Sequence, residues 1–90
     1  MFNKIQNDMV SAMKNRDKIK RESLGNLIGA IKNAGIAIGI KENFSDELVL
    51  KVLQKETRIV QEQIDTCPDS ALDKKELFNM RLNLYKQYLP

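Results

Sequence analysis

The sequence predicts an all-α protein, a compact bundle of four helices joined by short loops. Apolar residues recur at three- and four-residue steps along most of the chain, which is the period of an amphipathic helix. No segment shows the two-residue alternation that is typical of a strand, and no internal repeat appears. Helix-start signals near residues 17 and 45, and a chain break near residue 68, divide the pattern into four segments.

The length of the chain allows only one domain. A chain of 90 residues buries only about two-thirds of its unfolded surface, so a single core must serve all of it. The composition is 42% hydrophobic and 30% charged, which is typical of folded rather than disordered chains. We therefore expect residues 1–90 to form one helical domain that is ordered nearly throughout.

The first two helices are predicted over residues 2–15 and from Asp17 onward. The apolar residues on one face of the first are Phe2, Ile5, Met9 and Met13. Asp17 can accept a hydrogen bond from the free amides that begin the second helix. The buried face of this second helix reads Ile19, Leu24, Leu27, Ile31, Ala34 and Ile38. Gly35 and Gly39 each cost up to about 1 kcal/mol relative to alanine, so we expect its end to fray.

A third helix is predicted over residues 46–65, with Ser45 as the N-cap and Phe44 packing onto Val49 as a hydrophobic staple. The predicted buried stripe is Leu48, Val49, Val52, Leu53, Ile59, Val60 and Ile64. Glu56 stands where this stripe would otherwise have another apolar residue. The third helix should therefore bury one face and expose the other.

A fourth helix is predicted to extend to about Tyr88, with Pro68 in its first turn, where proline's missing amide hydrogen has no partner to lose. Its apolar face is unusually wide, with residues on two adjacent lines: Leu77, Leu84 and Tyr88, then Phe78, Leu82, Tyr85 and Leu89. We expect part of this face to stay uncovered. The candidate partner-binding residues are Phe78, Tyr85, Tyr88 and Leu89.

The residues needed for a self-contained active site are missing from the sequence. There is no histidine, the commonest general base and a frequent metal ligand. The four glycines lie within helical patterns and form no phosphate-binding loop. Glu56 and Glu62 are typical of solvated helix faces, and Cys67 has no partner residues for nucleophilic catalysis. We therefore predict no catalytic residue, no metal site and no small-molecule cofactor.

The same features predict a cytoplasmic protein with no membrane anchor. The single cysteine, Cys67, cannot form an intramolecular disulfide, and the polar N-terminus is unlike a secretory signal. The longest weakly charged stretch, residues 24–40, is interrupted by Asn26, Lys32 and Asn33 and is too polar to span a bilayer.

Positive charge gathers in the first half of the chain. Residues 1–41 carry eight basic and three acidic side chains, a net charge of +5, whereas residues 42–90 carry seven basic and nine acidic side chains, a net charge of −2. At 100° per residue, one side of the second helix carries Lys18, Arg21, Gly25, Gly29 and Lys32, opposite its apolar face. We call these residues, together with Lys14, the basic stripe.

Two interpretations of the basic stripe stay open. Glycine in a helix interior costs stability, so Gly25 and Gly29 between cations favour close approach of a phosphate backbone or another helix. In that case the stripe is a candidate nucleic-acid-binding surface with little base selectivity. The alternative is a solvated helix face on which the glycines have no role.

Five segments resemble blocks of the GatB/YqeY domain family, in the same order and at similar spacing. Residues 5–18 read IQNDMVSAMKNRDK, which is similar to the family's opening. The later blocks are AIKNA at 30–34, SDELV at 45–49, VLQKE at 52–56 and YLP at 88–90. The resemblance covers essentially the whole chain. It implies an all-helical protein corresponding to the N-terminal lobe of YqeY-like proteins.

The resemblance also implies a function. The family is related to the tail region of the tRNA-dependent amidotransferase B subunit, which helps to position misacylated tRNA, while other domains supply the chemistry. Family membership would suggest carbon–nitrogen ligase activity with glutamine as the amide donor, but we predict that this chain is not an enzyme. Family members usually continue past the equivalent of Pro90 into a second, smaller helical domain, which we expect to be absent here. Gly25 stands where the family pattern has a basic residue.

The sequence thus predicts a non-catalytic helical module that contacts tRNA or an amidotransferase-related partner. The alternative is a protein–protein adaptor or a homo-oligomer that uses the apolar face of the fourth helix and binds no nucleic acid.

Overall fold

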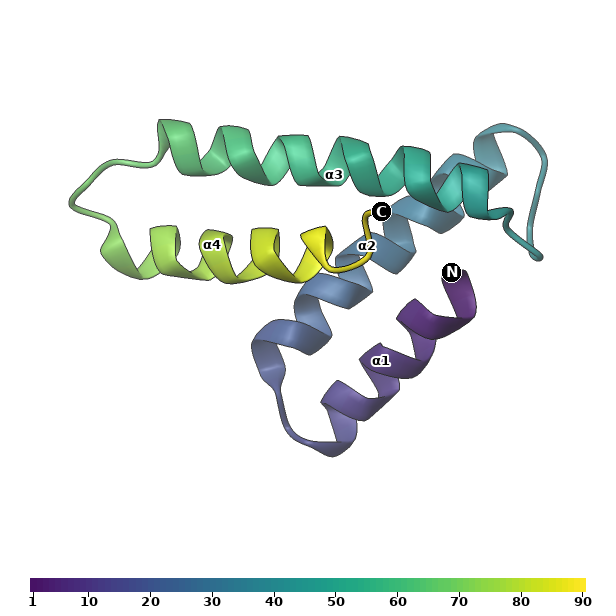
Figure 1. The fold of residues 1–90 in the computed structure, drawn as a ribbon, viewed down its shortest axis with the longest axis horizontal. Coiled ribbons are helices and arrows are strands. Elements are labelled where there is room, and N and C mark those ends of the chain that lie inside the picture. The colour runs from purple at the N-terminus through teal and green to yellow at the C-terminus, as the bar shows by residue number, and fades with distance from the viewer.

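The protein is all-helical in the computed structural model, which describes residues 1–90. The four helices are α1 (Phe2–Lys14), α2 (Lys18–Ala37), α3 (Asp46–Thr66) and α4 (Leu72–Lys86), and no strand is present (Figure 1). The predicted fold class, the number of helices and the short connections are confirmed. No helix is both long enough and apolar enough to cross a membrane.

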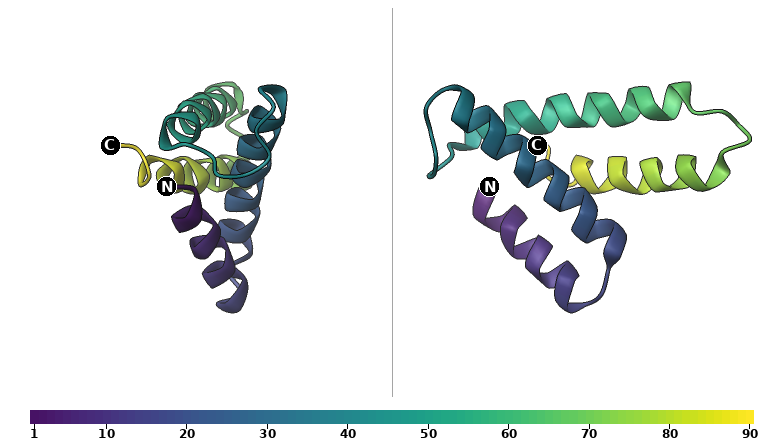
Figure 2. Two further views of the ribbon diagram at one scale, coloured as in Figure 1. Left: turned by 90° about the vertical axis from the view of Figure 1, so that its right-hand side faces the viewer. Right: turned by 180° about the vertical axis from the view of Figure 1, so that it is seen from behind.

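The four helices are arranged as two antiparallel hairpins, α1–α2 and α3–α4, which cross at α2 (Figures 1 and 2). α2 packs against each of the other three helices, so it is the centre of the fold. Because the hairpins cross instead of running side by side, the molecule measures 42 × 29 × 22 Å. The α1–α2 turn and the α3–α4 loop lie at two separate extremities (Figure 1).

The core lies where α2 meets the other helices. Its buried side chains are Ile5, Leu24, Leu27, Ile28, Ile31, Val49, Val52, Leu53, Val60, Leu82 and Tyr85. Eight of the apolar positions predicted for the first three helices lie in this core, and five more pack against it: Phe2, Met9, Ala34, Leu48 and Ile64. Met13, Ile38 and Ile59 are exposed, so those three assignments were wrong. Met13 lies in the last turn of α1, and Ile38 is the C-cap residue of α2.

Both predicted helix-start signals are confirmed. The Asp17 carboxylate accepts a hydrogen bond from the Lys20 amide at 3.2 Å, and the Ser45 hydroxyl accepts one from the Leu48 amide at 3.2 Å. Each side chain satisfies an amide that has no partner inside its helix. The Phe44 ring, expected to pack onto the third helix, packs edge-to-face against Phe2 at a centroid distance of 4.8 Å.

The end of α2 is well defined, which corrects the expectation of fraying. Gly39 adopts a left-handed φ of 80°, and its amide donates to the Ile36 carbonyl at 3.0 Å. The Ile40 amide donates to the Gly35 carbonyl at 2.8 Å, which completes a Schellman motif. Because glycine adopts positive φ without steric cost, Gly39 ends the helix instead of weakening it.

The start of the fourth helix lies later than predicted. Pro68 is not in its first turn; the Pro68 carbonyl accepts a hydrogen bond from the Ala71 amide at 2.9 Å, which closes a turn before α4 begins at Leu72. Pro68 therefore begins the turn that reverses the chain.

Candidate functional site

The four cations of the basic stripe are solvent-exposed. Lys14 ends α1, Lys18 and Arg21 lie in the first turn of α2, and Lys32 lies further along α2. None of them forms an ion pair with a carboxylate. They are therefore free to meet an anionic partner without first breaking an internal contact.

The stripe divides into two ends that face different hollows. Lys18 and Arg21 line a cavity of about 240 Å³ between the end of α1 and the start of α2. Lys32 lines a larger hollow of about 570 Å³, together with Lys41, the acidic residues Glu42 and Asp46, and the first residues of α1. Fourteen residues of helix separate Lys18 from Lys32, which is roughly 21 Å at 1.5 Å per residue. One small anion cannot bridge that distance, but an extended polyanion can.

The α1–α2 turn combines two locally unfavourable features. The first turn of α2 holds Lys18, Lys20 and Arg21 and no acidic residue, although the positive end of a helix dipole disfavours cations. Arg16 has a left-handed φ of 58°, which costs a non-glycine residue about 1–2 kcal/mol. Such local costs are typical of functional surfaces. We call residues 14–21 the basic turn.

Sequence reasoning missed Arg16 and Lys20 as members of this cluster. Arg16 lines the same cavity as Lys18 and Arg21, while Lys20 lines a different groove, between α2 and α4. The signal for both was the density of cations from Lys14 to Arg21, which the search for a single helix face overlooked.

The two glycines of the stripe have different surroundings. A Cβ atom added at Gly25 would lie 3.8 Å from the Met9 sulfur, so this residue faces α1 and not open solvent. A Cβ added at Gly29 would meet nothing within 4 Å. Of the two close approaches considered for these glycines, Gly25 therefore fits the approach of another helix, α1, and only Gly29 leaves space for an external partner.

The aromatic residues predicted to bind a partner lie against the protein's own core. Tyr85 is only 1% exposed, and its hydroxyl donates to the Ser23 carbonyl at 2.7 Å. Phe78, Tyr88 and Leu89 are partly buried and pack on the same core. The wide apolar face of α4 is thus covered largely by α2 and α3, which corrects the expectation that Tyr85 is available to a partner.

A buried polar cluster links α4 to α2, and sequence reasoning missed it. Ser23 is fully buried, its hydroxyl accepts a hydrogen bond from Arg81 Nε at 3.1 Å, and its carbonyl accepts the Tyr85 hydroxyl. Glu56 of α3 lies close enough for its charge to act on Tyr85.

The protein is expected to lose stability as the pH rises from about 10 to 12. Burial raises the pKa of Tyr85 from 10.0 to about 12, opposed by the positive charge of Arg81 and assisted to a smaller extent by Glu56. Burial and the Asp8 hydrogen bond at 2.6 Å also raise the pKa of Tyr88. The unfolded chain therefore releases protons that the folded chain retains, and the free energy of unfolding falls by up to about 1.4 kcal/mol per pH unit for Tyr85.

Urea unfolding at pH values below and above 10 measures this loss, with ultraviolet absorbance of tyrosinate as the direct readout, since these are the only two tyrosines. Tyr85→Phe should flatten the pH dependence. An equally steep fall in that variant would assign the effect to other groups.

The other side chains that could act as a nucleophile or bind a metal do not lie close to one another. Cys67 is half-buried, and its thiol contacts the Ala71 carbonyl at 3.8 Å. No three side chains of the metal-binding types come together anywhere in the chain.

The comparisons with known proteins give one match. A family model described as Yqey-like protein matches residues 2–90, which include both hairpins and the whole basic stripe. No curated protein and no solved structure gives a significant match. The match agrees with the family resemblance of the five sequence blocks. The chain belongs to the YqeY-like protein family.

Proposed function

We propose that this protein is a non-catalytic helical module that binds the phosphate backbone of tRNA through its basic stripe. The observation that supports the proposal most strongly is the basic turn. It places unpaired cations at the start of α2 and a left-handed arginine beside them, two features that lower the stability of the fold. A polyanion would offset the first of these costs, because its charge neutralises the cations that the helix dipole disfavours.

The shape of the stripe favours an extended partner. Lys18 and Lys32 are separated by about four turns of helix and face different hollows, which suits a backbone with many phosphates better than a single small anion. The family resemblance makes tRNA the nucleic acid to test first. It also makes an amidotransferase-related protein the partner class to test alongside tRNA.

The variant Lys18→Glu/Arg21→Glu is expected to weaken tRNA binding and to reduce the steepness of its salt dependence. Each phosphate contact that is removed lowers the slope of log K against log salt by about 1. Acidic residues suit the first turn of a helix, so this variant should fold at least as well as the wild type. Fluorescence anisotropy with labelled tRNA over a range of salt concentrations gives both quantities.

The matched control is Lys51→Glu/Arg58→Glu, which exchanges the same residue types at exposed positions on α3. It changes the net charge equally but leaves the basic stripe intact. If both double variants lose affinity to the same extent, the binding follows net charge and not the stripe, and the proposal is wrong.

A further inference from the structure

The side of α4 that faces away from the core carries a distinct pattern of side chains. Five exposed residues recur on this side at three- and four-residue steps: Asp73, Glu76, Met80, Asn83 and Gln87. We call them the outer face of α4. They lie opposite the aromatic residues that pack on the core. This face is acidic in its first half, carries an exposed methionine at its middle and is uncharged beyond it.

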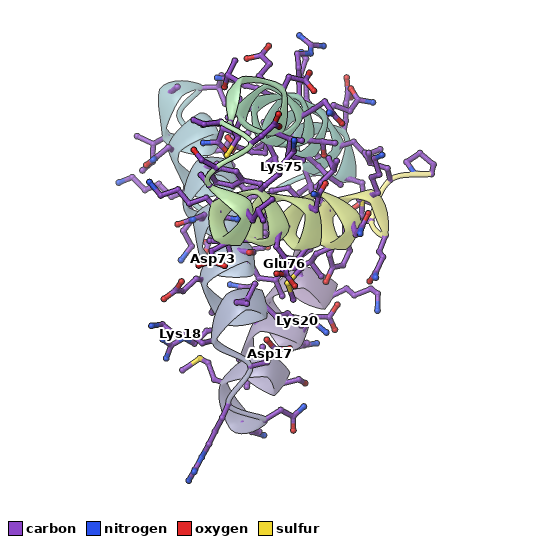
Figure 3. All side chains as sticks on the ribbon, turned by 90° about the vertical axis from the view of Figure 1, so that its left-hand side faces the viewer. Asp17, Lys18, Lys20, Asp73, Lys75 and Glu76 are labelled. Atoms are coloured by element: carbon purple, nitrogen blue, oxygen red, sulfur yellow. The ribbon has the colours of Figure 1, made fainter.

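A groove runs beside the second half of this outer face. It has a volume of about 310 Å³, and the start of α2 forms its other wall with Asp17, Ile19 and Lys20. Met80 lines the groove and is 47% exposed. Lys20 forms no ion pair, and neither does Glu76 or Asp73. Figure 3 shows the labelled acidic residues of α4 and the labelled residues at the start of α2 on the same side of the molecule.

We infer that this surface is a dimer interface, and that its occupant is the same surface of a second copy. The charges are arranged in a self-complementary way: Asp73 and Glu76 lie on one side of Met80, and the groove on the other side holds the unpaired Lys20 side chain, next to Asp17, whose carboxylate caps α2. A two-fold axis near Met80 would run the two α4 helices antiparallel. It would place Glu76 of each copy against Lys20 of the other and bring the two Met80 side chains together. An interface of this kind uses one patch twice.

The size of the surface indicates a weak dimer. An interface of standard size buries about 800 Å² on each partner, compared with 6217 Å² of accessible surface on the whole chain. α4 has 15 residues and is therefore roughly 22 Å long, so its outer face and the groove give a smaller contact. Because two of its contacts are exposed ion pairs, salt should dissociate the dimer.

Charge reversal tests the inference by sedimentation velocity at low ionic strength over a wide range of protein concentration. The wild type should show a concentration-dependent dimer. Lys20→Glu alone and Glu76→Lys alone should each raise the dissociation constant by about tenfold, because two attractive pairs become repulsive. An equimolar mixture of the two variants should form a dimer again, because each repulsive charge then faces its opposite.

The double variant Lys20→Glu/Glu76→Lys gives a second rescue. It keeps the net charge of the wild type and should dimerise like it. Lys51→Glu and Glu62→Lys, at exposed positions on α3, are the matched controls and should change nothing. A monomeric wild type at every concentration, single variants that behave like the wild type, or a mixture that stays monomeric would each overturn the inference. Each of these results is measured without tRNA and so stands or falls separately from the proposed function, although Lys20→Glu also removes a cation from the basic turn.

Discussion

Replacing Tyr85 by alanine is expected to lower the free energy of unfolding by about 3–5 kcal/mol, the usual cost of removing a large aromatic side chain from a core. Tyr85 is 1% exposed and lies in the cluster where α2, α3 and α4 meet. Its removal leaves a cavity and breaks the hydrogen bond of its hydroxyl to the Ser23 carbonyl at 2.7 Å. Urea unfolding followed by far-ultraviolet circular dichroism measures the loss.

A milder change keeps this prediction testable if the alanine variant does not fold. Tyr85→Phe retains the ring and removes only the hydroxyl, so it should cost about 1 kcal/mol, the usual net contribution of one hydrogen bond, because the Ser23 carbonyl lies inside α2 and keeps its helical partner. Tyr88→Phe is a useful control, because its hydroxyl bonds the partly buried Asp8 at 2.6 Å, where water can replace it more easily. If Tyr85→Phe proves as stable as the wild type, the hydrogen bond to Ser23 contributes nothing.

Gly35→Ala is expected to destabilise the protein by about 1–3 kcal/mol, although alanine is the better helix former. Gly35 is buried near the end of α2, and a Cβ atom there would overlap the Phe44 ring and lie 2.8 Å from the Ile40 carbonyl oxygen. The backbone cannot give way easily, because the same turn holds the hydrogen bonds that end the helix. Thermal and urea unfolding give the size of the effect.

Gly29→Ala is the matched control on the same helix. A Cβ atom at Gly29 meets nothing within 4 Å, so alanine should stabilise the fold by up to about 1 kcal/mol. The opposite signs of the two substitutions separate tertiary packing from helix propensity. If Gly35→Ala also stabilised the protein, the close packing of Phe44 on α2 would be wrong.

The sequence predicted the helices well because their signals are local. Asp17 and Ser45 cap α2 and α3 as predicted, since a side-chain oxygen next to free amides acts within three residues. Errors arose where two interpretations of one residue compete. Pro68 suits both a first helical turn and a β-turn, and Gly39 suits both a weak helix and a helix end; in each case the hydrogen bonds of the folded chain select the second.

The candidate site was predicted in part. The cations of the basic stripe are exposed as expected, because lysine and arginine side chains are rarely buried without an acidic partner. The aromatic residues of α4 were predicted to bind a partner, but they pack on the protein's own core. A wide apolar face is equally consistent with burial by two neighbouring helices and with binding of a separate partner. For Gly25 the sequence left open whether another helix or a phosphate backbone approaches it, because its neighbour, Met9, belongs to another helix.

By itself, the sequence determined the all-α class, the four helices, most of the core positions and the family. Periodicity and capping are properties of neighbouring residues, so they can be recognised before the chain folds. Only the tertiary structure decided that two hairpins cross at α2, that Ser23, Arg81 and Tyr85 form a buried polar cluster, and that the outer face of α4 lies beside Lys20. Those contacts join residues about 60 positions apart, and no local pattern determines which helix faces meet.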